Sequence, residues 1–246
     1  MKSNKITVYV CTILSVLSGI GMYLIEKISP MDTDILQSIC SGIFTGLIVS
    51  LVIAFIGYFH EREVLLNKAG SNLGNLYINM QVLSQTMGNI SAQIHTATEI
   101  DKLPFGMVSD LATYNIKTFE KMDLNLFEPF FPNSDLRRVY LRLDHLMDHA
   151  YNIKNIAQSL QKQMLEYTNS TLKAQRNTPN PNDFMTLDLQ KNELNIRAAK
   201  FHEYVTSKTL ELEQNLGAFY KCRHRKKEWD NLKPRLDAQA EAVMRM

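Results

Sequence analysis

Two long, uncharged apolar stretches stand near the start of the sequence, at residues 6–25 and 35–59. A hydrocarbon core of roughly 30 Å is crossed by about 20 helical residues, so each stretch is long enough to span a membrane. Because the backbone must satisfy its own hydrogen bonds in lipid, we predict that both stretches are helices. No pattern of small residues typical of a cleavage site follows the first stretch, which argues against a signal peptide. Residues 1–59 are therefore predicted to form a transmembrane hairpin.

The pattern of apolar positions changes directly after the second stretch. Apolar side chains now recur in steps of three and four, which is the spacing of a helix in a coiled coil or bundle. The residues of this first seam are Leu66, Ala69, Leu73, Leu76, Met80, Leu83, Met87, Ile90 and Ile94. Since no proline interrupts residues 59–98, we expect the second membrane helix to continue into the helix at 60–98 as one rod. Gly70, Gly74 and Gly88 are expected to weaken that rod locally.

Three further helices are predicted, at about 107–122, 135–176 and 183–232, the last one ending before Pro234. The helix at 135–176 has a seam made of Leu136, Val139, Leu143, Leu146, Ala150, Ile153, Ala157, Leu160, Met164, Tyr167 and Thr171. The helix at 183–232 carries Leu187, Leu194, Ala198, Phe201, Val205, Leu212, Phe219 and Cys222. A short turn joins these two long helices, so they should lie antiparallel. An aromatic segment with Phe127, Phe130 and Phe131 is expected to plug one end of the bundle, or else to form a knob for a partner or a membrane surface.

The predicted fold is thus an all-α membrane protein: a two-helix transmembrane hairpin followed by a long antiparallel helical bundle or coiled coil at 60–246. Lys2 and Lys5 precede the first span, whereas the connector at 26–34 has three acids and one lysine. Lysine and arginine favour the cytoplasmic side, so the N-terminus and the C-terminal domain should both be cytoplasmic. Three cysteines, two of them within the spans, fit a reducing compartment.

Small residues recur at every fourth position of both predicted spans, which keeps neighbours in each series on one side of the helix. They are Thr7, Cys11, Ser15 and Gly19 on the first span, and Ser38, Gly42, Gly46, Ser50 and Ala54 on the second. Either the two stripes face each other within one hairpin, or they pack between copies in a homo-oligomer. A second polar line, Gln37, Ser41 and Thr45, would be able to wet a narrow pore in such an oligomer. No charged residue or histidine lies within either span, which argues against a proton-coupled transporter or a voltage sensor.

One pair of histidines has the spacing of a metal site. Asp144-His145 and Asp148-His149 place both imidazoles on one helix face. No recognisable motif supplies a third ligand. We therefore interpret both histidines as solvated helix surface and predict no metal and no cofactor. A phosphate-binding glycine loop, a nucleophile elbow and a dinucleotide fingerprint are also missing from the sequence. We therefore predict that the protein is not an enzyme.

A local basic cluster consists of Lys221, Arg223, Arg225, Lys226 and Lys227. The formal net charge of the whole chain is only +2, so the cluster is a local feature. It is either a solvated helix end or, if the last helix runs back towards the membrane, a contact for anionic lipid. A polyanion such as nucleic acid is a further option, but one basic turn with only Trp229 nearby gives it little support.

The layout of two N-terminal spans with a small-residue face, a short outer turn and a cytoplasmic helical domain resembles two-transmembrane effector proteins of bacterial anti-phage systems. These include retron-associated effectors and SLATT-type proteins. The resemblance implies an effector in the bacterial inner membrane that partner proteins keep silent and that oligomerises and permeabilises the membrane when infection is sensed. The cytoplasmic helices would bind those partners. The alternative is a membrane-anchored scaffold or adaptor whose spans only tether it.

Overall fold

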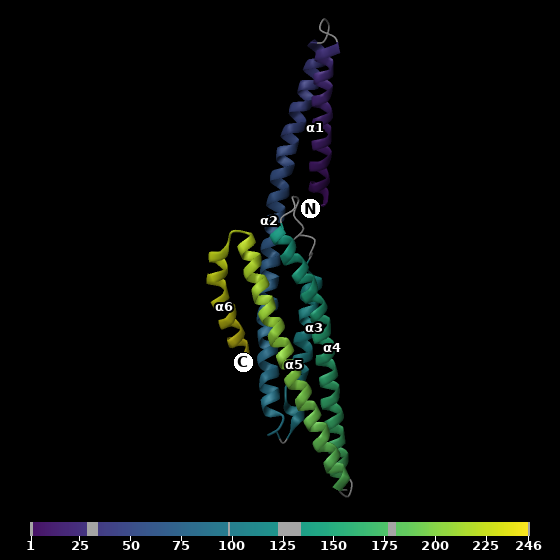
Figure 1. The fold of residues 1–246 in the computed structure, drawn as a ribbon, viewed down its shortest axis with the longest axis vertical. Helices are drawn as coiled ribbons and strands as arrows, with labels where there is room; N and C mark the ends of the chain where they lie inside the picture. Colours follow the sequence, from purple (N-terminus) through teal and green to yellow (C-terminus); the bar gives the residue numbers. More distant parts are fainter. Residues whose placement is uncertain (1, 29–33, 98, 123–133, 177–180, 246) are drawn as a thin grey trace. The chain divides into compact units, whose positions relative to one another are not determined.

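The computed structural model describes residues 2–28, 34–97, 99–122, 134–176 and 181–245, which are helices and the turns between them. No strand occurs in these ranges, so the all-α prediction is confirmed for them (Figure 1). The chain divides into two compact units, Met1–Lys68 and Ala69–Met246. The aromatic segment with Phe127, Phe130 and Phe131 lies outside the described residues.

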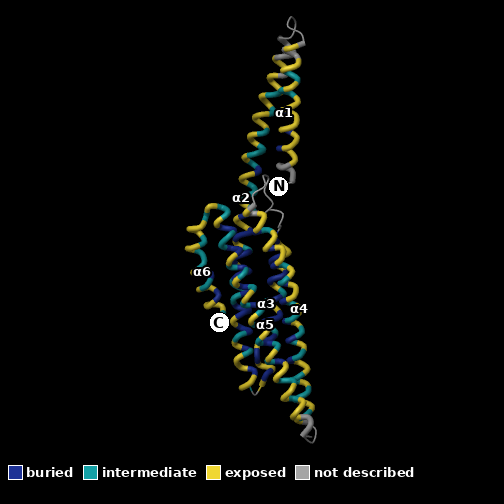
Figure 2. Tube along the Cα trace, in the orientation of Figure 1, coloured by how far each residue is buried: buried dark blue, intermediate teal, exposed yellow. Residues whose placement is uncertain are grey.

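The first unit contains α1 (Lys2–Ile28) and the first part of α2 (Asp34–Gln93). Both helices are long and apolar enough to cross a membrane. A core helix of a soluble protein can meet the same criteria, but it is mostly buried. Here only 17% of the most apolar window of α1 and 6% of that of α2 are buried, as the prevalence of exposed positions in Figure 2 illustrates.

Helix α2 is a single helix of 60 residues that begins in the first unit and ends in the second. Its pattern of side chains changes along its length, from apolar all round to an apolar seam on one side. All nine seam residues from Leu66 to Ile94 are buried. The sequence pattern therefore identified the buried face of this helix correctly, and the helix ends at Gln93 rather than at residue 98.

The second unit is an antiparallel bundle in which α3 (Phe105–Glu120) packs on α4 (Ser134–Arg176) and α4 packs on α5 (Pro181–Cys222) (Figure 1). Two contacts fix the direction of α5 against α4. His149 Nδ1 lies 2.7 Å from the Tyr204 hydroxyl, and Arg197 donates to the Ser159 hydroxyl over 3.1 Å. Because the later residue of α4 contacts the earlier residue of α5, the two helices run in opposite directions.

Helix α5 also runs antiparallel to α2, and polar side chains of α5 bond to the α2 backbone. The Thr209 hydroxyl donates to the Met80 carbonyl over 3.3 Å, and His202 Nδ1 lies 2.9 Å from the Ser84 carbonyl oxygen. Gly88 permits this close approach, since a Cβ atom there would lie 3.1 Å from the His202 ring. The glycine expected to weaken α2 is therefore a place where a bulky side chain of α5 packs against the α2 backbone.

The chain after α5 differs from the prediction of one helix over 183–232. Helix α5 ends at Cys222, the chain reverses, and α6 runs from Lys226 to Met244 with Pro234 inside it. Proline removes one backbone donor, a cost that is reduced here because Pro234 is exposed and water can reach the freed carbonyl. The reversal lets α6 bury Leu236 and Ala240, which a straight continuation of α5 would leave without a partner surface.

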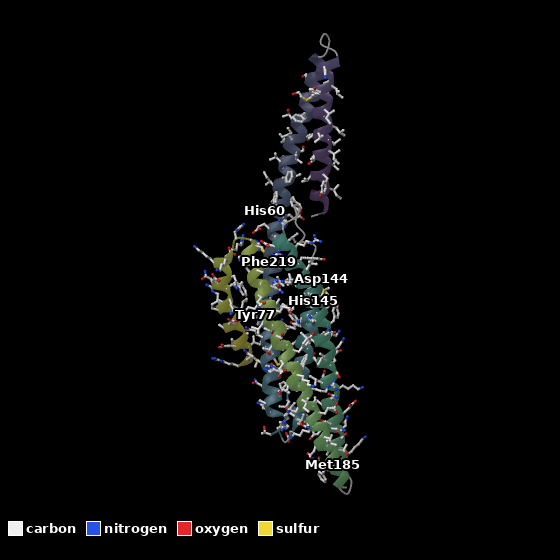
Figure 3. All side chains as sticks on the ribbon, in the orientation of Figure 1. His60, Tyr77, Asp144, His145, Met185 and Phe219 are labelled. Atoms are coloured by element: carbon white, nitrogen blue, oxygen red, sulfur yellow. The ribbon has the colours of Figure 1, made fainter. Side chains whose placement is uncertain are left out.

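A polar network fastens α6 to the bundle. The Tyr77 hydroxyl on α2 lies 3.0 Å from Asp237 Oδ1 and 3.2 Å from Glu213 Oε2. The hydroxyl is the hydrogen-bond donor and the carboxylates are the acceptors. Gln81 Nε2 donates to the same Asp237 oxygen over 2.9 Å, and Lys233 pairs with Glu213 at 2.8 Å. Burial, followed by the hydrogen bond to Asp237, raises the pKa of Tyr77 far above its usual range. The network thus joins α2, α5 and α6 around the buried phenol of Tyr77, which Figure 3 labels.

Candidate functional site

The small-residue stripe of α2 is open along most of its length. Ser38, Gly42, Gly46 and Ser50 are exposed, and only Ala54 is half-buried. A Cβ atom built on Gly42 or Gly46 would have no heavy atom within 4 Å apart from its own helix. Within the described part of the chain, this face of α2 therefore has no packing partner.

The corresponding stripe of α1 behaves differently. Cys11 and Ser15 are buried, Gly19 is half-buried, and only Thr7 at its start is exposed. A Cβ atom on Gly19 would lie 3.6 Å from the Phe44 ring of α2. The small residues of α1 thus make room for a large side chain of α2, not for the small residues of α2.

The hypothesis that the two stripes face each other is therefore wrong for the hairpin in this structure. The α2 positions that are half-buried in the first unit include Phe44, Leu47 and Leu51, which recur in steps of three and four. A spacing of four turns about 40° around the helix at each step, so a stripe of five residues cannot stay on one face. By Ala54 the α2 stripe has drifted towards the side facing α1, and its earlier members point elsewhere.

The second polar line of α2 is partly described. Ser41 and Thr45 are exposed, and the Gln37 side chain lies outside the described residues. The Thr45 hydroxyl donates to the Ser41 carbonyl over 2.8 Å. Because its proton is used within the helix, Thr45 can face an apolar surrounding at little cost.

The basic cluster lies at the turn between α5 and α6, not on a continuous helix. His224 N–H bonds to the Lys221 carbonyl over 3.0 Å, and Arg225 N–H bonds to the Tyr220 carbonyl over 2.9 Å. This pair of bonds is the Schellman motif, which needs a residue with positive φ and commonly uses glycine. His224 takes that place with φ 57°, the only positive φ of a non-glycine residue in the described chain.

The cations of the cluster differ in how they are held. Lys221, Lys226 and Lys227 are exposed, whereas Arg223 and Arg225 are half-buried. The Arg223 guanidinium lies over the Phe219 ring, 5.2 Å from its centre, and Arg225 pairs with Glu228 at 3.3 Å. The turn is also backed by aromatic packing, since Tyr220 stacks on Trp229 with their ring centres 5.8 Å apart. These contacts give the turn a defined shape.

Next to this turn, a cleft of about 490 Å³ separates the start of α4 from the end of α5. Among the described residues, its polar lining is Asp135, Arg138 and Arg142 from α4 and Lys221 and His224 from the end of α5 and its turn. Val139, Ala218 and Cys222 also line it. Burial raises the pKa of the Cys222 thiol, so this cysteine is a neutral wall residue at neutral pH rather than a thiolate nucleophile.

The histidine pair on α4 is less exposed than the sequence suggested. His145 is exposed, but His149 is half-buried, with its Nδ1 on Tyr204 and its Nε2 enclosed without a partner. The interpretation of His149 as solvated surface was wrong, because α5 packs over this side of α4. Burial, and then the nearby Lys208, hold the pKa of His149 below its usual range. In the described residues no group of three or more His, Cys, Asp or Glu side chains is arranged to hold a metal ion.

Comparison with protein-family models, curated proteins and solved structures gives no match for this chain. Function must accordingly be inferred from the geometry of the chain itself.

Sequence reasoning missed three lining residues of the basic cleft: Arg138, Arg142 and His224. A signal for the two arginines was present, since a spacing of four places them on one face of the predicted helix. The sequence does not say which helix lies beside that face. His224 gave no such signal, because histidine is an uncommon residue for a Schellman turn.

Proposed function

We propose that this protein is a non-enzymatic membrane effector that forms homo-oligomers through the open face of α2 and thereby perturbs or permeabilises the bilayer. The observation that carries this proposal is a contrast between glycines of the two helices. A Cβ atom built on Gly19 would lie against the Phe44 ring, whereas one built on Gly42 or Gly46 would have no heavy atom within 4 Å apart from its own helix.

The exposed apolar surface of the first unit supports location in a membrane. Ile13, Ile53 and Ile56 are exposed to 59%, 65% and 65% respectively, and many of their apolar neighbours on the two helices are similarly exposed. Continuous apolar surface of this extent requires a cover of lipid or protein. Helices of this length and composition are suited to lipid.

The open face of α2 supports self-association in that setting. Lipid chains are as apolar as leucine, so helix association in a bilayer depends on close packing rather than on hydrophobic burial. Small residues allow two backbones to approach, and Gly42-x-x-x-Gly46 with Ser38 and Ser50 offers such a surface. A second copy of this chain has the same face, and a symmetric contact would cover both.

The continuity of α2 supports a link between the bundle and the oligomer. The same helix carries the open small-residue face and the buried seam from Leu66 to Ile90. A partner that rotates or shifts α2 within the bundle would therefore also reorient the Gly42–Gly46 face. Control of this kind fits the anti-phage effectors that the layout resembles, with partner proteins holding the bundle in its silent arrangement.

The test is expression of the full chain in a bacterial host with recording of membrane potential and growth. We expect depolarisation in the wild type and its loss in Gly42→Leu/Gly46→Leu, together with loss of the oligomer in detergent or by crosslinking in membranes. Gly21→Leu on α1 is the matched control, because Gly21 also has no atom within 4 Å of a built Cβ but lies off both stripes. Unchanged depolarisation and oligomer size in the double variant would refute the proposal.

A membrane-anchored scaffold is the second candidate, and an exposed apolar group at the start of α5 favours it. Phe184, Met185 and Leu189 are exposed to 56%, 67% and 61% (Figure 3 labels Met185). A partner helix would bury this group. Replacing both apolar helices with an unrelated hairpin separates the candidates, because a scaffold would keep its function whereas the proposed effector would lose it.

A further inference from the structure

The basic cleft draws its cations from two segments far apart in the sequence. Arg138 and Arg142 come from the start of α4, and Lys221 and His224 come from the end of α5 and its turn. The antiparallel packing of α4 on α5 brings them together. Three permanent cations and one histidine thus face a space in which Asp135 is the single carboxylate among the described lining residues.

The positions of the arginines are not explained by helix electrostatics. Lys221 in the last turn of α5 neutralises the partial negative charge at a helix C-terminus, which is the favourable arrangement. Arg138 lies about one turn and Arg142 about two turns after the start of α4 at Ser134, beyond the first turn where the charge of a helix end acts. Neither arginine therefore offsets a helix-end charge, and a group of opposite charge in the cleft would neutralise them.

The acidic side chains of the described chain do not fully supply that charge. Arg138 reaches Asp135 at 3.8 Å, in a pair with side chains exposed to 74% and 66%. Arg142 and Lys221 have no carboxylate within ion-pair distance in the described residues. The cleft therefore presents cations that are assembled but incompletely neutralised, which is the condition that favours an anionic ligand.

The position of the cleft within the bundle indicates which anion. At the same level as the end of α5, a Cβ atom on Gly70 of α2 would lie 3.2 Å from Phe219 and 3.3 Å from the Tyr220 hydroxyl (Figure 3 labels Phe219). In the chain, Gly70 follows closely on the apolar stretch that ends at Phe59, and residues 60–69 belong to the same helix. The cleft is therefore at the end of the bundle where α2 enters it.

We infer that the cleft between α4 and the α5–α6 turn binds the phosphate of an anionic phospholipid head group, through Arg138, Arg142 and Lys221. Lys226 and Lys227 in the adjoining first turn of α6 add to the attraction of the anionic surface. Val139 and Ala218 give the cleft an apolar wall for the carbon skeleton of the head group. This inference rests on the proposed membrane location but not on the proposed oligomer or on permeabilisation.

The fluorescence of Trp229 reports whether the cleft binds lipid. Trp229 is the only tryptophan of the chain, and it stacks on Tyr220 beside the turn. The full chain in nonionic detergent is titrated with short-chain phosphatidylglycerol, with phosphatidylcholine of the same chain length, and with inorganic phosphate at constant ionic strength. We expect a saturable change in Trp229 fluorescence with phosphatidylglycerol only.

The variant Arg138→Gln/Arg142→Gln/Lys221→Gln tests the cleft. A cation next to an anionic lipid surface contributes about fivefold to binding, so three substitutions should raise the apparent Kd on the order of a hundredfold. The matched control is Lys162→Gln/Lys173→Gln/Lys200→Gln, which removes the same charge from exposed positions away from the cleft. Circular dichroism establishes that both variants are folded.

Each outcome bears on the inference. Equal losses in the two triple variants would mean that general charge, not the cleft, attracts the lipid, and would overturn it. A response to inorganic phosphate without one to phosphatidylglycerol would assign the cleft to a free phosphate and refute the lipid. No response to either ligand would refute the site. Depolarisation plays no part in this titration, so failure of the effector proposal leaves the result interpretable.

Discussion

The Tyr77 hydroxyl is expected to account for much of the attachment of α6, and Tyr77→Phe removes it without opening a cavity. Tyr77 is 1% exposed, and its hydroxyl lies within hydrogen-bond distance of both Asp237 and Glu213. A hydrogen bond to a charged group contributes about 1.5–3 kcal/mol, and here it also separates two carboxylates. Since Gln81 keeps its own bond to Asp237, we expect a loss of about 2 kcal/mol in the free energy of unfolding.

The dependence on pH distinguishes this mechanism from simple loss of packing. Because the pKa of Tyr77 is raised in the folded state, its contribution is fully present below the ordinary pKa of 10.0 and declines as the pH rises above it. The decline approaches about 1.4 kcal/mol per pH unit once the unfolded phenol ionises. The difference in the free energy of unfolding between wild type and Tyr77→Phe should therefore be largest near neutral pH and should narrow above pH 10.

Thermal unfolding of the full chain in detergent, followed by circular dichroism between neutral pH and pH 11, measures that difference. Tyr151→Phe is the control, because the Tyr151 hydroxyl also donates to a carboxylate, Glu120 at 2.9 Å, but from an exposed position. Its substitution should leave the midpoint nearly unchanged. A difference for Tyr77→Phe that is absent at neutral pH, or that stays constant up to pH 11, would refute the reasoning.

Two further predictions concern the bundle. Gly74→Ala should raise stability by about 1 kcal/mol through helix propensity, since the new methyl group would meet Leu236 at an ordinary 3.6 Å. Gly88→Ala should lower stability, because the His202 ring at 3.1 Å would have to move. The thermal unfolding midpoints of the two variants are compared with that of the wild type. Stability should also fall as the pH drops below about 6.5, the usual pKa of histidine, because the folded state resists protonation of His149. A His149→Gln variant should show a shallower loss between about pH 7 and 5 in the same assay, and an equally steep loss would contradict this.

The core of the bundle was largely predictable from spacing alone. All nine seam residues from Leu66 to Ile94 are buried, and so are those from Val139 to Met164 on α4. Spacing in steps of three and four identifies a buried helix face whatever covers it, which is why these positions were found. Tyr167 and Thr171 are only half-buried, because a seam pattern does not say where the neighbouring helices end.

The features that were missed depend on chain reversals and on contacts between distant segments. The reversal at His224 has neither glycine nor proline within it, whereas Pro234, read as a helix end, lies inside α6. The open face of α2 was visible as a stripe, but only the structure distinguishes it from the occupied stripe of α1. The basic cleft required knowledge that the start of α4 lies beside the end of α5.

The order in which the helices that cover α2 are made has a consequence during synthesis. Gly70 leaves the ribosome long before Phe219, the α5 residue that packs against it, and α6 follows later still. At roughly 5–20 residues per second, the intervening chain takes on the order of 10–30 seconds to make. Throughout that interval the seam from Leu66 to Ile94 lacks its α5 cover, so a binding protein that is present during translation would have access to a surface that the finished bundle conceals.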